Sequence, residues 1–307
     1  MSHLRKYGYK PCEGTTGLWG HEILPTKFAL SVDDFMVKYY TKEHATHLIK
    51  ALQDKNEIAQ DWSGKNFCGL KFKWNYEKRF VDMSMPNYVT KALMKFNHKH
   101  PKQPQHAPYK WSIPLYGRKV QMVHPTNPQP FLSKKDTRVV QSKVGTFLYY
   151  GQAVDPTILV ALNDISGDQA KPTPSTTKDL TMLMDFLATY PNATIQYVAG
   201  TIQLKLESDV PLPNMYNHIA QNRPIHTECT ILKNVVCSVA EAECGGVFHN
   251  CQKAIIICRA LQALGHKQSP TEVITNNSTT ASFVHSTMRS KRSKTWDMRW
   301  NWLQDKL

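Results

Sequence analysis

Two adjacent aspartates, Asp33 and Asp34, interrupt a run at residues 27–37 that is otherwise typical of a β-strand. Burying a bare carboxylate is costly unless it is paired or binds a metal ion. The sequence therefore predicts two strands joined by a turn instead of one buried strand. Either the turn simply exposes both carboxylates to water, or the hairpin presents them to a divalent cation such as Mg²⁺, which prefers oxygen ligands.

Length and charge narrow the possible partners. The chain has 307 residues and a formal net charge of +14, which predicts two or three domains and an acidic partner, with nucleic acid ahead of an anionic membrane. The longest aliphatic run, residues 254–257, is too short to span a bilayer. No apolar segment typical of a signal peptide follows the first residues. We therefore expect an intracellular protein, cytoplasmic or nuclear, without membrane contact.

Hydrophobic periodicity predicts alternating strands and helices. Helices are expected over 41–52, 87–96, 140–150, 156–166, 180–190, 238–264, 279–287 and 296–306. Strands are expected at 67–74 and 80–85, at 272–275, and as a hairpin of 193–198 with 201–206. The segment 97–130 is rich in Pro, His and Lys and is expected to form a long basic loop or linker. Residues 210–224 are expected to be irregular, because Pro211 and Pro213 disfavour a strand.

Four of the seven cysteines recur every seven residues, at positions 237, 244, 251 and 258. This spacing places them along one slowly drifting stripe of the predicted helix 238–264. An odd number of cysteines suits reduced thiols better than disulfides. Because the stripe lacks close Cys-x-x-Cys pairs, it indicates a packed helix face and not a zinc site.

Five short motifs occur in a characteristic order. They are Leu-Ser-Val-Asp-Asp-Phe at 30–35, Asp-Trp-Ser-Gly at 61–64 with Cys-Gly at 68–69, Val-Gly-Thr-Phe-Leu-Tyr-Tyr at 144–150, Ala-Glu-Ala-Glu at 240–243, and Lys-Arg-Ser-Lys-Thr-Trp-Asp-Met-Arg at 291–299. Together they span nearly the whole chain. In this order they resemble the C-terminal part of a Ty1/copia-type retrotransposon polyprotein, in which a reverse transcriptase is joined to ribonuclease H.

The resemblance implies an α/β (α+β) fold in three parts. A truncated reverse-transcriptase palm would occupy residues 1–85. Helices of a thumb and connection would follow over 86–198, with the basic Pro-rich linker near 97–130. A ribonuclease H-like domain would occupy 199–307.

The polymerase site of this family uses three aspartates and two metal ions, which clamp the attacking and leaving oxygens of an in-line displacement. By resemblance, Asp33 and Asp34 are two of these catalytic residues and Mg²⁺ ligands. The third belongs to an upstream strand, but Asp33 is the first aspartate of this sequence. We therefore expect the third aspartate, the fingers and half of the palm to be absent. Ser31 also stands where many reverse transcriptases have an aromatic residue.

The ribonuclease H site of the family is a cluster of carboxylates around two Mg²⁺ ions. By resemblance its catalytic and metal-binding residues are Asp209, Glu243 and Asp297, and the fourth metal position holds Asn276. A neutral amide there lowers the negative charge of the site and its affinity for Mg²⁺. Simpler interpretations stay open, since Asp209 suits a turn and Asp297 suits the first turn of a helix.

A basic cluster precedes the last predicted helix. Its members are Arg289, Lys291, Arg292 and Lys294. Such a cluster is either a solvated loop or a binding site for a nucleic-acid backbone.

The resulting functional expectation is a fragment of an RNA-directed DNA polymerase with ribonuclease H, both dependent on Mg²⁺. Its partners would be primer–template and RNA–DNA hybrid, and whether a protein partner exists stays open. We expect no polymerisation by the chain alone and weak or absent hybrid cleavage. Two alternatives stay open: a non-catalytic binder of hybrid or single strands through charge and aromatic stacking, and a relic reading frame with no selected role.

Overall fold

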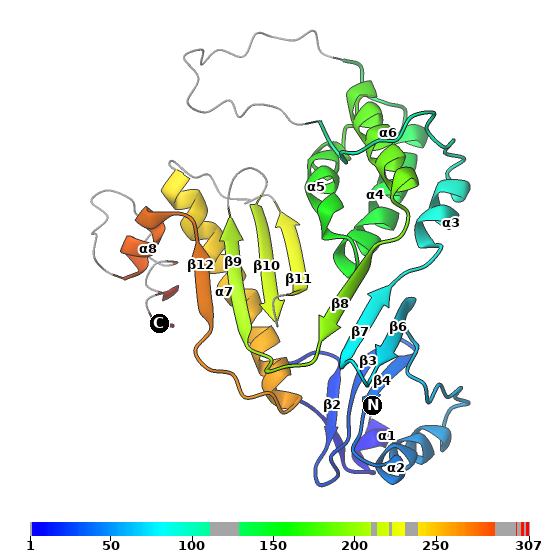
Figure 1. Cartoon of the computed structure of the whole chain (residues 1–307), viewed down its shortest axis with the longest axis vertical. Helices are drawn as coiled ribbons and strands as arrows, with labels where there is room; N and C mark the ends of the chain where they lie inside the picture. The colour runs from blue at the N-terminus through cyan, green and yellow to red at the C-terminus, as the bar shows by residue number, and fades with distance from the viewer. Residues whose placement is uncertain are drawn as a thin grey trace.

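The computed structural model describes residues 2–110, 129–209, 214–220, 223–230 and 239–285, together with 299, 302–303 and 305–306. Within these residues the chain forms three four-stranded sheets, with helices between and against them (Figure 1). The predicted mixed α/β class is therefore confirmed.

The first sheet is an antiparallel meander of β1, β2, β3 and β4. Its strands are Tyr9–Pro11, Leu18–His21, Lys27–Ser31 and Asp34–Lys38, preceded by α1, Ser2–Arg5. Helix α2, Lys42–Gln53, begins after Thr41 as predicted and buries Leu48 and Ala51 against Tyr9 and Phe28 of the sheet. This small core holds the β3–β4 hairpin in place.

The second sheet is assembled from segments far apart in sequence. Its order is β5, β6, β7 and β8, which span Asn66–Phe67, Leu70–Asn75, Phe80–Ser84 and Thr194–Val198. The predicted hairpin of 193–198 with 201–206 is wrong, because β8 pairs with β7, where Thr194 lies opposite Ser84. The side chain of Gln196 on β8 donates a hydrogen bond to Asp82 of β7 at 2.8 Å. Pairing with β7 is a long-range contact that local alternation could not reveal.

A helical subdomain lies between β7 and β8 in sequence. It contains α3 (Tyr88–Lys95), α4 (Lys134–Ala153), the short 3₁₀ turn η1 (Pro156–Ile158), α5 (Leu159–Asp168) and α6 (Pro174–Thr189). Val140, Val144 and Phe147 are buried, whereas Leu148 lies on the exposed side of α4. These helices share the largest buried core of the described residues.

The helix predicted over 140–150 is longer in the structure, where α4 continues to Ala153 and Gly151 lies inside it. A Cβ at this position would lie 2.9 Å from Leu159 Cδ2 and 3.1 Å from Ile158 Cγ1. The glycine therefore allows the turn that begins α5 to pack closely against α4. Its structural role is close approach and not termination of the helix.

The described parts of the segment 97–130 contain no helix or strand, as predicted. Residues 97–110 are nevertheless attached to α6. The His98 ring lies 2.8 Å from Asp185 Oδ1, and the Gln105 N–H donates to Thr189 Oγ1 at 3.0 Å. Residues 111–128 lie outside the described part.

The third sheet has the order β11, β10, β9 and β12, with α7 across one face (Figure 1). Its strands are β9 (Leu204–Asp209), β10 (Asn214–Ala220), β11 (Arg223–Thr230) and β12 (Glu272–Thr275). Strand β12 runs parallel to β9, whereas β9, β10 and β11 are antiparallel. The connection to β12 contains α7, Val239–Ala263, and α8, Ser278–Val284, follows β12.

The expectation that residues 210–224 are irregular is wrong for the part that the structure describes, because β10 begins at Asn214 and pairs with both β9 and β11. The β10–β11 register shifts between His218 and Ile219, where the chain approaches Pro224. Pro224 lies on β11, at the edge of the sheet, where a missing N–H is tolerated.

The cysteine stripe packs as predicted in the described part of α7. Cys244 and Cys251 lie in one apolar cluster, and Cys251 and Cys258 border a second. Burial raises the pKa of Cys244 and of Cys251 to about 11 each. Their position in the two apolar clusters gives these thiols a packing role.

Candidate functional site

The two aspartates that interrupt the first hairpin lie at its tip. Ser31 pairs with Asp34, so that Val32 and Asp33 form the two-residue turn. Val32 adopts a left-handed φ of 53° and is 90% exposed, an unusual conformation for a β-branched residue. Both aspartates are exposed. The predicted strand–turn–strand is confirmed, and both carboxylates face solvent.

Asp34 joins this hairpin to the second sheet. Its Oδ2 accepts a hydrogen bond from the Cys68 N–H at 3.0 Å. Cys68 and Gly69 form the two-residue turn between β5 and β6, with positive φ values of 49° and 76°, as favoured hairpin turns require. The turn thereby directs the Cys68 N–H toward the aspartate.

Tyr149 of α4 completes this junction. Its hydroxyl donates a hydrogen bond to the Cys68 carbonyl. Burial raises the pKa of Tyr149, with smaller contributions from Cys68 and Asp34. Three of the sequence motifs, from residues 30–35, 68–69 and 144–150, therefore meet in one cluster.

Asp61, in the motif at 61–64, organises the loop before β5. Its carboxylate accepts hydrogen bonds from the N–H groups of Ser63 at 2.9 Å and Lys65 at 3.0 Å. It also accepts from the Ser63 hydroxyl. The hydrogen bond from the Ser63 side chain is the main cause that lowers the pKa of Asp61 to about 2. The geometry assigns this carboxylate a structural role.

The second group of predicted acids belongs to the β9–β12 sheet. Thr275 pairs with Ser208 across parallel strands, so Asp209 and Asn276 follow at the same edge. The backbone of Asp209 ends β9, and Asn276 is exposed. On α7, Glu243 is buried at 4% exposure and Glu241 is partly exposed. The two glutamates, two positions apart, therefore lie on different faces of the helix.

The other predicted functional residues cannot be placed. Asp297 and the basic cluster Arg289, Lys291, Arg292 and Lys294 lie outside the described residues. Among the residues that are described, no group of three or more His, Cys, Asp or Glu side chains could hold a metal ion. Asp33 and Asp34 belong to a different sheet from Asp209 and Asn276.

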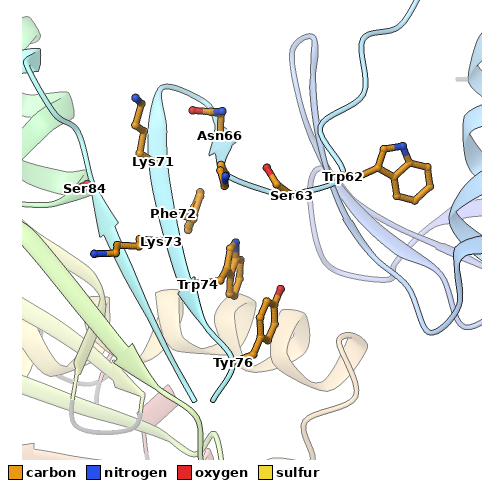
Figure 2. A pocket seen from close by; sticks show the side chains of 10 residues that line it. Trp62, Ser63, Asn66, Lys71, Phe72, Lys73, Trp74, Tyr76 and Ser84 are labelled. Atoms are coloured by element: carbon orange, nitrogen blue, oxygen red, sulfur yellow. The ribbon is translucent and has the colours of Figure 1, made fainter. Parts of the chain in front are cut away.

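The structure has an aromatic surface on β6 that was not predicted from the sequence. Phe72, Trp74 and Tyr76 form a ladder of nearly parallel rings beside a hollow of about 620 Å³ (Figure 2). The sequence signal was available, since aromatic residues alternate with Lys71 and Lys73 along this strand.

Comparison of the chain with protein-family models, with curated proteins and with solved structures found no match. In the described part of the chain, none of the helices combines the length and the apolar character needed to cross a bilayer.

Proposed function

We propose that this chain is a nucleic-acid-binding protein derived from the reverse transcriptase and ribonuclease H of a Ty1/copia-type element, and that these 307 residues alone do not polymerise DNA. The ligands proposed are primer–template and RNA–DNA hybrid. A net charge of +14 favours an acidic partner such as nucleic acid.

The junction of Asp34, Cys68 and Tyr149 carries this proposal. The two hydrogen bonds connect residues that are 34 and 81 positions apart in sequence. Each residue belongs to a motif that suggested the resemblance. Motifs that are scattered in sequence but adjacent in space are what a shared ancestral site would produce.

The third sheet supports the same descent. A ribonuclease H-like domain needs a first strand that is flanked by an antiparallel strand and a parallel one, and β9 lies between β10 and β12 in this way. The resemblance also needs acids after these strands and on the helix between them. Asp209 and Glu243 are acids at two of those positions in the chain, and the third is occupied by the amide Asn276.

Magnesium is the cofactor that the resemblance implies. Oxygen donors at these positions are of the kind that Mg²⁺ takes. The hairpin carries two of the three carboxylates that the polymerase chemistry uses, and residue 276 is an amide. These donors do not fit a fully charged two-metal site, and we derive no catalytic step through Mg²⁺.

Binding and catalysis can be tested separately on the purified chain. We expect a fluorescein-labelled RNA–DNA hybrid to bind, and the logarithm of the binding constant to fall linearly with the logarithm of salt concentration. Asp33→Asn should leave this affinity unchanged, because binding relies on basic groups. Absence of hybrid binding at low salt would overturn the proposal.

The catalytic half of the proposal has its own readout. Primer extension on an RNA template should be absent with Mg²⁺ or Mn²⁺, and hybrid cleavage should be weak or absent. Clear extension that Asp33→Asn abolishes would show instead that the chain is a working polymerase.

A further inference from the structure

Three aromatic side chains form a continuous ladder along β6 and the turn after it. The ring centroids of Phe72 and Trp74 are 6.0 Å apart with planes at 18°, and those of Trp74 and Tyr76 are 6.0 Å apart at 9°. All three rings lie on the same side of the strand (Figure 2). Trp74 is 40% exposed and Tyr76 is 80% exposed. The ladder therefore ends in aromatic rings that are open to solvent.

The neighbouring loop holds the ladder in position. Trp74 Nε1–H donates a hydrogen bond to the Gly64 carbonyl at 2.9 Å, and the Phe72 N–H donates to the Lys65 carbonyl at 2.8 Å. The same loop is fixed by the Asp61 carboxylate, which accepts from Ser63 and Lys65. The Trp74 ring consequently loses little conformational freedom when a ligand stacks on it.

The charge beside the rings is positive. Three lysines, Lys65, Lys71 and Lys73, line the hollow, and none of its lining residues is acidic. Strand β5 pairs with β6 at Lys71 and Leu70, and beyond this pair only the Lys65 carbonyl accepts a hydrogen bond from the backbone of β6 on this outer edge, at Phe72, among the described residues. Lys71 and Lys73 leave the other face of the strand (Figure 2), and their long side chains can reach around this edge.

We propose that the ladder of Phe72, Trp74 and Tyr76 is a binding site for the unpaired bases of a single-stranded nucleic acid, whose phosphates contact the three lysines. Bases of any sequence have a π-face that stacks on aromatic rings, and each stacked base contributes substantially to affinity. Duplex bases already stack on one another and leave no free face. The site requires unpaired bases, so loss of single-strand binding can be measured separately from the proposed binding of RNA–DNA hybrid.

The decisive comparison uses two tyrosines of similar exposure. Tyr76 is 80% exposed and Tyr40 is 85% exposed, so replacing either with alanine removes little packing. We expect Tyr76→Ala to weaken binding of labelled oligothymidylate and oligouridylate by roughly five-fold or more, measured by fluorescence anisotropy on the full chain. Tyr40→Ala should bind like the unaltered protein. Equal affinities of the two variants would overturn the proposal.

Three further measurements test whether the ligand is single-stranded and whether it stacks on the rings of the ladder. Oligothymidylate should quench tryptophan fluorescence, and Trp74→Phe should remove most of that quenching while keeping a stacking ring. Lys65→Gln should reduce the slope of log affinity against log salt by about one. Tyr76→Ala should leave RNA–DNA hybrid binding unchanged. Three results would contradict a single-strand site. The first is an equal loss of hybrid and single-strand affinity in Tyr76→Ala. The others are undiminished quenching in Trp74→Phe and no binding of any oligonucleotide.

Discussion

The carboxylate of Asp34 accepts a hydrogen bond at 3.0 Å from the backbone N–H of Cys68, 34 residues later in the chain. This contact connects the β3–β4 hairpin to the turn between β5 and β6. The Cys68 carbonyl in turn accepts from Tyr149 on α4. One peptide turn therefore links two sheets and a helix.

Removing the acceptor should loosen this junction. Asp34→Ala is expected to speed amide hydrogen exchange at Cys68 and to lower the free energy of unfolding by about 1 kcal/mol, the typical net value of one hydrogen bond. Asp34→Asn keeps an acceptor oxygen and should have a smaller effect. Asp33→Ala, at the exposed tip, serves as the control. Unchanged exchange at Cys68 in Asp34→Ala would refute the contact.

Two glycines of α4 should respond in opposite directions to alanine. Gly151→Ala places a Cβ within 2.9 Å of the buried Leu159 side chain, and overpacking of this kind costs about 1–3 kcal/mol. At the exposed Gly145 a Cβ has no neighbour within 4 Å. Gly145→Ala should therefore stabilise the helix by about 0.5–1 kcal/mol. Urea unfolding of both variants measures the difference, and destabilisation of both would contradict this packing.

The loop at 61–66 should loosen in acid. Since the native pKa of Asp61 is lowered from 3.8 to about 2, its contribution to stability is present above pH 4 and is lost as pH falls toward 2. Carboxyl NMR should follow this titration. Asp61→Ala should shift the fluorescence of Trp74 already at neutral pH, because the loop supplies the Gly64 carbonyl that Trp74 contacts. A native Asp61 that titrates at its ordinary pKa would exclude the described hydrogen bonds.

Alkaline pH should weaken packing around α7. Burial raises the native pKa of Cys244 and Cys251 from 9.0 to about 11, so the unfolded chain loses these thiol protons first. Stability should consequently fall as pH rises from 9 toward 11. Between pH 9 and 10, Cys251→Ala should show a shallower fall in the free energy of unfolding than the unaltered chain. The same slope in both proteins would argue against the raised pKa.

If the proposed descent is right, placing a carboxylate after β12 should increase the affinity for Mg²⁺. The structure forms β10 directly after the segment that follows Asp209, so the sheet that would support such a site is in place. Asn276→Asp is expected to give a larger rise in melting temperature on adding MgCl₂ than the unaltered chain, because a ligand stabilises the state that binds it. Asn277→Asp, one residue further on, is the matched control. An equal response of both variants would exclude a metal site at residue 276.

Local patterns determined most single elements. The amphipathic spacing of Ala45, Leu48 and Leu52 correctly predicted α2, and the alternation at residues 67–85 correctly predicted the β6–β7 pair. The cysteine stripe correctly predicted a packed face of α7. These signals are local because one helix or one hairpin buries its own apolar side.

Pairing between distant segments could not be derived in this way. Strand β8 lies beside β7, across a helical insertion, and not beside β9. Strands β10 and β11 form despite a proline-containing sequence, since β9 and β10 supply hydrogen-bonding partners for their backbones. Gly151 lies inside α4, where the absence of a side chain allows Leu159 to pack closely. In each case the deciding contact comes from another part of the chain.

The candidate sites likewise depend partly on local sequence and partly on contacts between distant segments. The sequence by itself determined that Asp33 and Asp34 must leave a buried strand, since a bare carboxylate is costly to bury. Only the tertiary structure decided that Asp34 contacts Cys68, and that Phe72, Trp74 and Tyr76 stack in line beside three lysines. Hydrogen bonds and ring contacts depend on distance in space, and folding alone brings these segments within reach of one another.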